Sequence, residues 1–294
     1  MVKKSKLYTD SWKVAFRKNA KGNILTDKAT PFQIIKNSWR YWAADPFLFT
    51  YNNTTYIFAE LYDYLTRKGT LGYCKLDNSK KLKWKKVISE SYHLSYPYIF
   101  NIEDDIYIIP ESNESHSVYM YKSTSFPNKW EKKKVLRTDV IYVDTTPCTY
   151  VNHNIAITYD ISNNEQYKLH LLNLVDESKD IQIDGIPFLQ RPAGNFFKHK
   201  NNIVRPAQIC KNEYGEGLIF YEISFDSFDN YKEDEITRIY PEELTYSKRI
   251  PLNGMHTYNI LGEYEVIDIK TQEFNVIDLL MRIFNKLKCV WRMP

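Results

Sequence analysis

Three carboxylates come from three successive repeated segments of the sequence and could carry acid–base chemistry. Asp45 lies in the string ADP, Asp144 in VDTTP and Glu111 in IPES. Glycosyl chemistry uses carboxylates in this way, because one group activates the incoming nucleophile while another protonates the departing oxygen. An Asp close to a Pro can equally start a turn, which is the alternative for each aspartate alone. The joint occurrence of Asp45 and Asp144 at equivalent repeat positions favours function over turns, and Glu111 joins them from the repeat between, so we predict catalytic roles for Asp45, Glu111 and Asp144.

Further polar side chains occupy positions of the same kind. Arg191 and Arg205 can each bind a phosphate or a carboxylate through two hydrogen bonds. His93 and His256 can bind sugar hydroxyls or phosphate oxygens, or move a proton, although a lone His is more often a structural residue. We predict that these four bind substrate. Three more predicted substrate-binding residues are Glu60, Tyr96 and Gln208.

The acidic run at residues 103–105 resembles a metal-binding cluster only superficially. It falls at the tip of a predicted hairpin, where solvated charges are usual. The four cysteines, Cys74, Cys148, Cys210 and Cys289, stand alone and lack the spacing of metal ligands, which indicates free thiols. We therefore predict no metal site and no cofactor.

One hairpin pattern recurs five times along the chain. Each copy is an apolar run, a polar turn and a second apolar run, and the copies follow one another about every fifty residues. They begin at Ala44, Ser95, Asp144, Gly194 and Gly254. Two further strand-like runs follow most copies, such as GTLGYCKL and KWKKVI after the first. Four strands per repeat are typical of a propeller blade.

The repeat predicts an all-β fold, a five-bladed β-propeller over residues 1–273. A β-sandwich also has short strands at regular spacing, but it has no reason to repeat one hairpin five times. The first strand of each propeller blade lines a central channel. The leading polar side chains of the five hairpins should therefore meet in one pocket.

Residues 274–294 break the pattern and predict an amphipathic helix, because their apolar residues recur at helical spacing. Such a basic amphipathic helix can lie at a membrane interface, and it can equally fold back on the propeller flank. Periodicity does not separate the two, since both use the same apolar stripe. The basic and aromatic residues beside the stripe are Arg282, Lys286, Lys288, Trp291 and Arg292.

Composition narrows the class of protein further. Aromatic residues make up 15% of the chain, including 24 Tyr, and such rings favour strands and also pack against the faces of sugars. The net charge of +4 is spread along the sequence and gives no strong field for nucleic acid. No apolar run has the length of a signal peptide or a membrane span. These features predict a cytoplasmic protein with no nucleic-acid partner.

The five-blade plan with an ADPF motif resembles the furanosidase superfamily, which includes glycoside hydrolase families 43, 32 and 68. A closer resemblance is to the propeller domain at the N-terminus of plant glucosamine inositolphosphorylceramide transferases and in bacterial surface-polysaccharide loci. The strings WAADPFLF, HLSYPYIF, YIIPES, RPAQICKNEYGEGL and GMHTYN carry it, from about Trp12 to Asp268. In the furanosidases an Asp-Pro of the first blade supplies the base or nucleophile, and Asp45 matches that position.

One departure from the furanosidases bears on the reaction. Those enzymes add a second carboxylate, for which Asp144 can stand, and a Glu acid in a later blade. The fourth repeat, RPAGNFFKHKNNIVRPAQ, contains no carboxylate, and Glu216 and Glu222 lie further along. A missing acid impairs hydrolysis, but it matters less for a nucleotide-sugar donor, whose leaving phosphate favours cations. The basic groups therefore indicate a transferase.

The resemblance and the residues together predict a glycosyltransferase of bacterial cell-surface polysaccharide or glycolipid assembly. Its partners would be a nucleotide-sugar donor and a glycan or glycolipid acceptor, and the C-terminal helix would hold it at the inner face of the membrane. Asp45 would act as the base. Two alternatives stay open: a furanosidase-like hydrolase with Glu111 or Glu222 as the acid, and a non-catalytic sugar-binding propeller.

Overall fold

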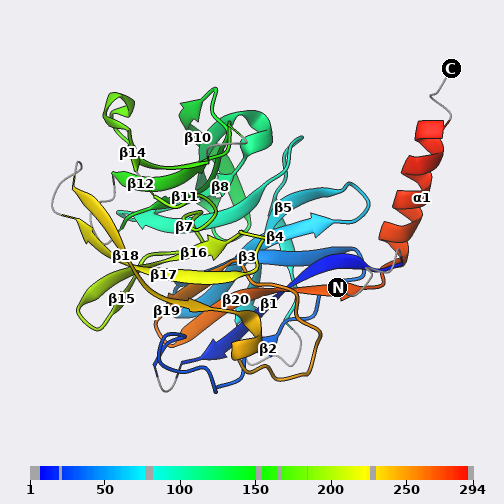
Figure 1. The fold of residues 1–294 in the computed structure, drawn as a ribbon. Helices are drawn as coiled ribbons and strands as arrows, with labels where there is room; N and C mark the ends of the chain where they lie inside the picture. The colour runs from blue at the N-terminus through cyan, green and yellow to red at the C-terminus, as the bar shows by residue number, and fades with distance from the viewer. Residues whose placement is uncertain are drawn as a thin grey trace.

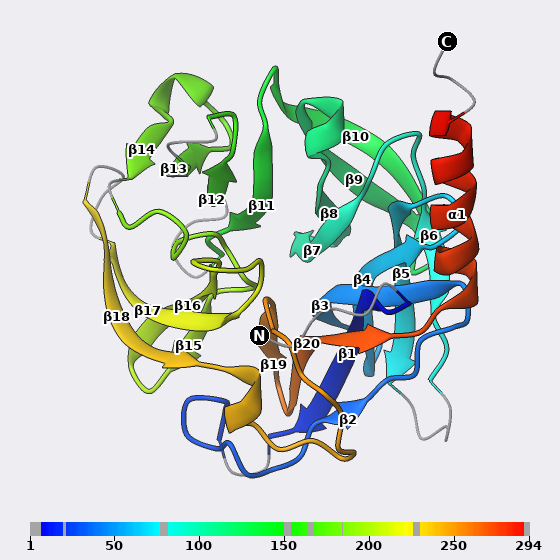
Figure 2. The same ribbon diagram turned by 45° about the vertical axis from the view of Figure 1, so that its right-hand side comes forward.

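The protein consists of five four-stranded antiparallel sheets and one C-terminal helix. The sheets are arranged around a common centre (Figures 1 and 2). The predicted all-β, five-bladed propeller is therefore confirmed. The structure is a computed structural model that describes residues 7–19, 22–76, 82–149, 154–163, 167–183, 185–225 and 230–290.

The five blades follow the order of the chain. Blade 1 contains β3 (Tyr41–Tyr51), β4 (Thr54–Asp63), β5 (Lys68–Leu76) and β6 (Lys85–Ile88). Blade 2 contains β7 (Ser95–Ile102), β8 (Asp105–Glu111), β9 (Ser117–Ser125) and β10 (Lys129–Thr138). Blade 3 contains β11 (Tyr142–Pro147), β12 (Ile155–Asp160), β13 (Lys168–Asn173) and β14 (Ile181–Ile183). Blade 4 contains β15 (Phe197–His199), β16 (Asn202–Ile209), β17 (Gly217–Phe225) and β18 (Tyr231–Ile239). Blade 5 contains β19 (Tyr258–Leu261), β20 (Tyr264–Glu273), β1 (Thr9–Lys18) and β2 (Gln33–Ile34).

The five predicted hairpins form the first two strands of the five blades. The turn of the third hairpin lies partly outside the described residues, at positions 151–153. Blade 5 is made from both ends of the chain, because β1 pairs with β20 from Thr9–Glu273 to Lys18–Tyr264. This pairing closes the ring of blades by main-chain hydrogen bonds.

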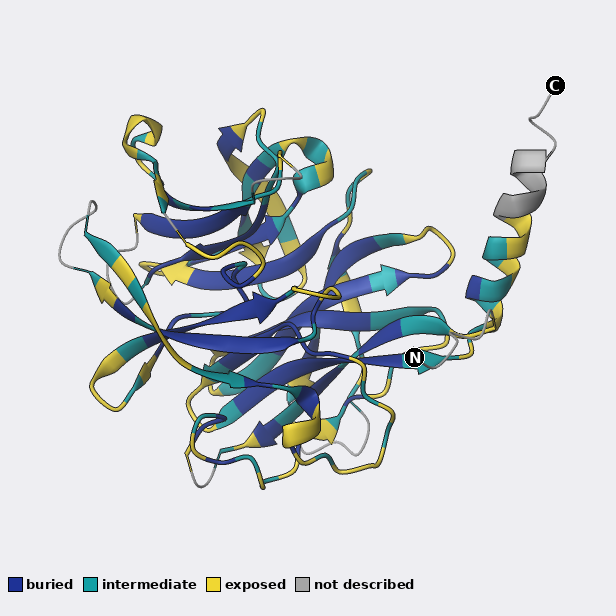
Figure 3. Cartoon of the chain, viewed as in Figure 1, coloured by how far each residue is buried: buried dark blue, intermediate teal, exposed yellow. Residues whose placement is uncertain are grey.

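Apolar side chains fill the spaces between neighbouring blades. Phe58 on β4 and Ile108 on β8 belong to one fully buried cluster between blades 1 and 2. Phe220 on β17 packs edge-to-face against Tyr258 on β19, with ring centroids 5.6 Å apart. Burying such a side chain contributes about 1.5–3 kcal/mol. The strands near the centre are accordingly buried, whereas the outer strands β10 and β18 carry exposed residues (Figure 3).

The C-terminal helix α1 (Val276–Val290) begins two residues later than the predicted segment and stands away from the propeller (Figure 1). Its first turn is tied to blade 1, since Asp278 is buried with a carboxylate oxygen 3.6 Å from Nη1 of Arg67. The side chains of Leu280 and Ile283 are exposed. The propeller flank therefore leaves Leu280 and Ile283 uncovered. Four predicted side chains fall outside the described part: Lys286, Lys288, Trp291 and Arg292.

No helix in the described part of the chain combines the length and apolar character needed to cross a bilayer. The thiols of Cys148 and Cys210 are free, as predicted, and Cys74 is buried on β5. The side chain of Cys289 lies outside the described residues.

A buried ion pair anchors the loop between β1 and β2 to blade 5. Arg17 Nε donates to Glu265 Oε2 at 2.7 Å, and both side chains are almost fully buried. The two Nη atoms of Arg17 donate to the carbonyls of Thr30 and Asp27, while Glu265 Oε1 accepts the hydroxyl of Tyr258. Because both charges are enclosed, each depends on the other for compensation.

Replacing Arg17 by Met should lower the free energy of unfolding by about 3–5 kcal/mol, because Glu265 would keep a buried charge without its partner. Lys18→Met is the matched control, since the neighbouring Lys18–Glu263 pair is exposed and such pairs contribute little. Urea unfolding curves measure both variants. Equal losses in the two would contradict the structural role of Arg17.

Candidate functional site

A pocket of about 300 Å³ lies where the five blades meet. Every blade contributes to its wall, which places it on the propeller axis. The charged or titratable side chains of its lining are Asp45, Glu60, His93, Glu111, Arg191 and His256. The aromatic side chains of its lining are Trp12, Trp42, Tyr62 and Tyr214.

Three residues around the pocket share an unusual backbone conformation. Asp45, Tyr96 and Asp144 have φ values of 50°, 45° and 53°, in the left-handed region that non-glycine residues seldom adopt. Each lies at the register shift of a bulge in the first strand of its blade, on β3, β7 and β11. Such strain, about 1–3 kcal/mol per residue, persists only where the surroundings hold the conformation. The bulges aim these residues at the axis.

The carboxylate of Asp45 is held from both sides. Its Oδ1 accepts the hydroxyl of Thr257 at 3.0 Å, and its Oδ2 accepts the backbone amide of Tyr96 at 3.3 Å. The backbone amide of Asp45 itself donates to Oδ2 of Asp268 at 3.0 Å. Blades 5 and 2 thereby fix the orientation of a carboxylate on blade 1 that borders the pocket.

The imidazole of His256 lies between two carboxylates. Nε2 is 3.2 Å from Asp45 Oδ1, and Nδ1 is 2.7 Å from Asp268 Oδ2. The indole of Trp12 covers the ring at a centroid distance of 4.0 Å. Burial lowers the pKa of His256, but the charges of Asp268 and Asp45 outweigh burial and raise the pKa to about 9. We therefore take the ring as an imidazolium at neutral pH.

The same three residues could hold a cation, because their ligand atoms lie within 4.8 Å of one another. Each ring nitrogen, however, already faces one of the two carboxylates. The protonated ring thus supplies the positive charge that a metal ion would bring. The prediction that the protein has no metal site stays a prediction.

Two carboxyl groups of the pocket have pKa values near neutrality. Burial raises the pKa of Asp45, the charge of His256 opposes this, and the result is about 7. Burial and the charge of Asp144 raise the pKa of Glu111 to about 8, against the opposing charge of Arg191. The charge of Asp45 also raises the pKa of Glu111, so the titrations of the two groups are linked. The site can therefore hold one ionised and one protonated carboxyl group near neutral pH.

Arg191 joins three blades at the pocket wall. Its Nε donates to Asp144 Oδ2 at 2.5 Å, and its Nη2 lies 3.4 Å from Glu111 Oε2. Asp144 Oδ2 also accepts the side-chain amide of Gln208 at 2.9 Å. The guanidinium lies 5.2 Å from the ring centre of Tyr214. Asp144 thus positions Arg191 from behind.

Glu60 and His93 form a further pair at the wall, with His93 Nε2 3.2 Å from Glu60 Oε1. The amide of Gly69 donates to Nδ1 of the same ring at 3.1 Å. Glycine is required there, because a Cβ at position 69 would come within 2.5 Å of Glu60 Oε1 and of the Leu94 carbonyl oxygen. The close approach of β5 therefore orients His93.

The structure brings most of the predicted site residues together. Six of them line the pocket: Asp45, Glu60, His93, Glu111, Arg191 and His256. Three others are buried behind the wall: Tyr96, Asp144 and Gln208. Tyr96 bonds through its hydroxyl to Thr146 and to the amide of Gly194. The binding and catalytic roles of all nine stay predictions.

Arg205 is placed differently from the prediction. It is fully buried, and its Nε and Nη2 bind the carboxylate of Glu233 on β18 at 2.5 and 2.7 Å. Its Nη1 donates to the carbonyl of Gln190. Arg205 therefore braces blade 4 instead of facing the pocket. From its position in the repeat, Arg205 was predicted to bind substrate. The sequence did not reveal its partner, because Glu233 lies on a different strand far along the chain.

Sequence reasoning missed Asp268, Thr257, Trp12 and Tyr214. A signal existed for Asp268, since it occupies the second strand of the fifth hairpin, as Glu60 does in the first. No signal in the sequence pointed to Trp12, because this residue reaches the pocket only through the pairing of β1 with β20 in blade 5.

Comparison with known proteins identifies the relatives of this fold. A family model described as glucosamine inositolphosphorylceramide transferase 1, N-terminal, matches residues 35–264. The chain belongs to this family. It is 28% identical to the transferase of that name from Arabidopsis thaliana over 253 residues, which is 79% of this chain and 31% of the relative. The rice (Oryza sativa subsp. indica) relative is 28% identical over 209 residues, 65% of this chain and 27% of the relative. The chain of this family member thus spans less than a third of those relatives.

Solved structures share the fold of this family member at low sequence identity. The catalytic domain of a family 62 α-L-arabinofuranosidase from Coprinopsis cinerea matches with a TM-score of 0.59 and 10% identity, over 84% of this chain and 96% of that one. An exo-β-1,3-galactanase from Phanerochaete chrysosporium matches with a TM-score of 0.52 and 12% identity, over 88% and 64%. These likenesses show the propeller fold.

The contribution of His256 to stability should fall as the pH rises from about 6.5 to about 9. Its pKa in the folded protein is about 9, above the ordinary 6.5, so the stabilisation that its charge gains, chiefly from Asp268, is complete below 6.5 and is lost as the ring deprotonates. The difference in free energy of unfolding between the wild type and His256→Gln should shrink across this interval. A difference that is independent of pH would mean that the ring is neutral throughout.

Proposed function

We propose that this protein transfers a glycosyl group from an activated donor to an acceptor hydroxyl, with Asp45 as the general base. The observation that carries the proposal is the setting of Asp45. Its carboxylate borders the central pocket, while Thr257 and the amide of Tyr96 hold its two oxygens. A carboxylate fixed in this way can take a proton from a hydroxyl bound in the pocket.

The pocket wall offers the two kinds of surface that a sugar ring uses. Trp42 and Tyr62 stack on each other with centroids 4.6 Å apart and both line the cavity. Flat aromatic faces pack against the apolar face of a sugar. Glu60 and Arg191 provide acceptors and donors for its hydroxyls. The volume of about 300 Å³ is at the lower end of small-molecule sites.

In the proposed reaction the acceptor oxygen bonds to the anomeric carbon while the bond from that carbon to the donor phosphate breaks. Asp45 takes the proton of the acceptor hydroxyl, and the departing phosphate keeps the electron pair. Carboxylates near the anomeric carbon stabilise the positive charge that develops there. Arg191 at the wall stabilises the negative charge on the leaving phosphate.

Family membership supports a carbohydrate-related function, and the name of the relatives describes transfer of glucosamine to inositolphosphorylceramide. We accordingly propose a nucleotide sugar as donor and a glycan or glycolipid as acceptor. The chain covers only 31% of the Arabidopsis relative, so the donor and the acceptor have to be tested on this chain directly.

Hydrolysis is the second candidate reaction, and the raised pKa of Glu111 favours it. Its pKa of about 8 keeps this pocket carboxyl protonated at neutral pH, as a general acid requires. Glu222, the other acid considered from sequence, lies on β17, the third strand of blade 4, and does not line the pocket. In this reaction a water molecule takes the place of the acceptor.

Asp45→Asn should lower the rate of glycosyl transfer by about 100-fold or more, because the amide cannot accept the proton of the acceptor. Asp104→Asn, at the exposed tip of the second hairpin, is the matched control and should leave the rate unchanged. Release of nucleoside diphosphate from a panel of nucleotide sugars, chosen by thermal shift, measures the rate.

Full activity of the folded Asp45→Asn variant would refute the base. Cleavage of an aryl glycoside with no response to any nucleotide sugar would favour hydrolysis. Sugar binding without turnover, unaffected by either substitution, would make the pocket a recognition site.

The pH dependence of the rate separates the two reactions. Transfer needs ionised Asp45, so its rate should rise as the pH rises through about 7 and then stay level. Hydrolysis also needs protonated Glu111, so its rate should fall again as the pH rises above about 8. Initial rates in buffers of constant ionic strength measure the profile. A rate that is flat across this range would contradict both assignments.

A further inference from the structure

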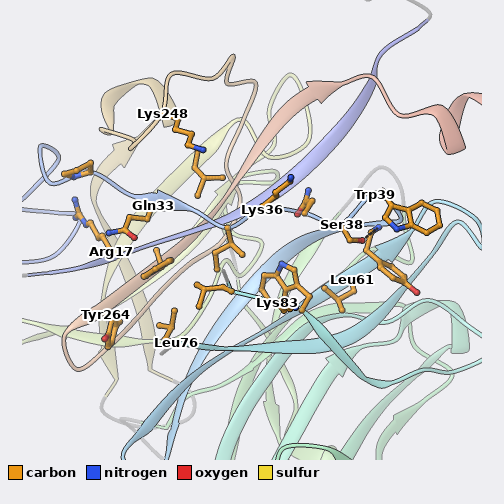
Figure 4. Close-up of a pocket in the computed structure, with 18 of the residues that line it drawn as sticks. Arg17, Gln33, Lys36, Ser38, Trp39, Leu61, Leu76, Lys83, Lys248 and Tyr264 are labelled. Carbon is orange, nitrogen blue, oxygen red and sulfur yellow. Dashed lines mark hydrogen bonds between the residues drawn. The ribbon is translucent and has the colours of Figure 1, made fainter. Parts of the chain in front are cut away.

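A second and larger cavity lies away from the propeller axis. It is a groove of about 1200 Å³ between blade 5 and blade 1, bordered by β1, β2, the segment 35–40 and β6. Trp39 lies at one end of this groove and Tyr264 at the other (Figure 4). The groove shares none of its lining residues with the central pocket.

The groove carries an excess of positive charge. Its lining contains no Asp and no Glu among the described residues. Three of its cations are paired with carboxylates beyond the lining, in the pairs Arg17–Glu265, Lys18–Glu263 and Arg40–Asp63. Four exposed lysines have no ion pair within the described chain: Lys36, Lys83, Lys86 and Lys248. This distribution favours an anionic ligand.

Between the lysines the wall is apolar. Ile34, Leu61, Leu76 and Trp84 contribute to it, so a ligand must present an apolar part as well as its charge. Two polar atoms of lining residues, Asn37 Oδ1 and Trp84 Nε1, are buried and lack a hydrogen-bond partner among the described residues. Such atoms are rare in the absence of a ligand or water.

The Trp39 end of the groove continues into the C-terminal helix. The Trp39 side chain is 73% exposed, and its carbonyl accepts the side-chain amide of Asn275 at 3.2 Å. Asn275 directly precedes α1, which stands away from the propeller (Figure 1). Leu280 and Ile283 on the described turns of α1 are 59% and 47% exposed. An exposed tryptophan and an exposed apolar helix face are features of proteins that dock at a bilayer surface.

We propose that the groove binds an anionic lipid from a bilayer on which Trp39 and the apolar face of α1 dock. The lipid phosphate lies among Lys36, Lys83, Lys86 and Lys248, and an acyl chain follows the apolar wall. A soluble anion would use the lysines but would leave the apolar wall and α1 without a role. The proposal is independent of the chemistry assigned to the central pocket.

Sedimentation of the full chain with vesicles tests the proposal. Vesicles of phosphatidylcholine with phosphatidylglycerol should bind the protein, and vesicles of phosphatidylcholine alone should bind it far more weakly. The double variant Lys36→Glu/Lys83→Glu should lose at least about 20-fold in affinity, because each lysine near an anionic surface is worth about fivefold. Added salt should weaken binding of the wild type.

Lys129→Glu/Lys232→Glu is the matched control, since it changes net charge equally at exposed positions on blades 2 and 4. It should keep most of the affinity. Leu280→Ser/Ile283→Ser should also weaken vesicle binding, because the helix face would no longer insert. All of these residues are exposed, so the variants should unfold at the wild-type temperature.

Three outcomes would overturn the proposal. The first is no preference for anionic vesicles, and the second is an equal loss in the groove and control variants. The third is thermal stabilisation by inorganic phosphate that depends on Lys36 and Lys83 while vesicles leave the protein in the supernatant. That result would assign the groove to a soluble anion.

Discussion

Hydrogen bonds between blades, at the bulges of β3, β7 and β11, are the interaction on which the pocket depends. Asp45 on blade 1 accepts from Thr257 on blade 5 and from the amide of Tyr96 on blade 2. The Tyr96 hydroxyl in turn bonds to Thr146 on blade 3 and accepts the amide of Gly194, which precedes blade 4. The chain of bonds crosses every blade. The left-handed backbone of Asp45 and Tyr96 is maintained by these partners.

The same arrangement sets the charges of the site. Burial makes isolated charges costly, so each acid near the axis is paired or has a raised pKa. His256 is shared by Asp45 and Asp268, and Arg191 is shared by Asp144 and Glu111. Burial nevertheless outweighs these cations at Asp45 and Glu111, whose pKa values of about 7 and about 8 allow each to change protonation state near neutral pH. This property allows acid–base chemistry in a cavity whose shape is held rigidly by the surrounding sheets.

Features that recur in each repeat could be predicted from the sequence. Features that depend on contacts between residues far apart in the chain were missed. The five hairpins, the propeller and six pocket residues followed from strand periodicity and from equivalent positions in each repeat. The entry of Trp12 and the burial of Arg205 against Glu233 did not follow, because both depend on pairing between segments far apart in the chain. The left-handed bulges were also missed, since a motif such as ADP is compatible with an ordinary turn.

The location of bound sugar tests the central claim most directly. A crystal structure of Asp45→Asn soaked with a nucleotide sugar that stabilises the protein would reveal it. The account predicts a sugar ring in the central pocket, against Trp42 and Tyr62, with its anomeric carbon near position 45 and the donor phosphate near Arg191. A sugar bound elsewhere, with the pocket empty of ligand, would contradict the account.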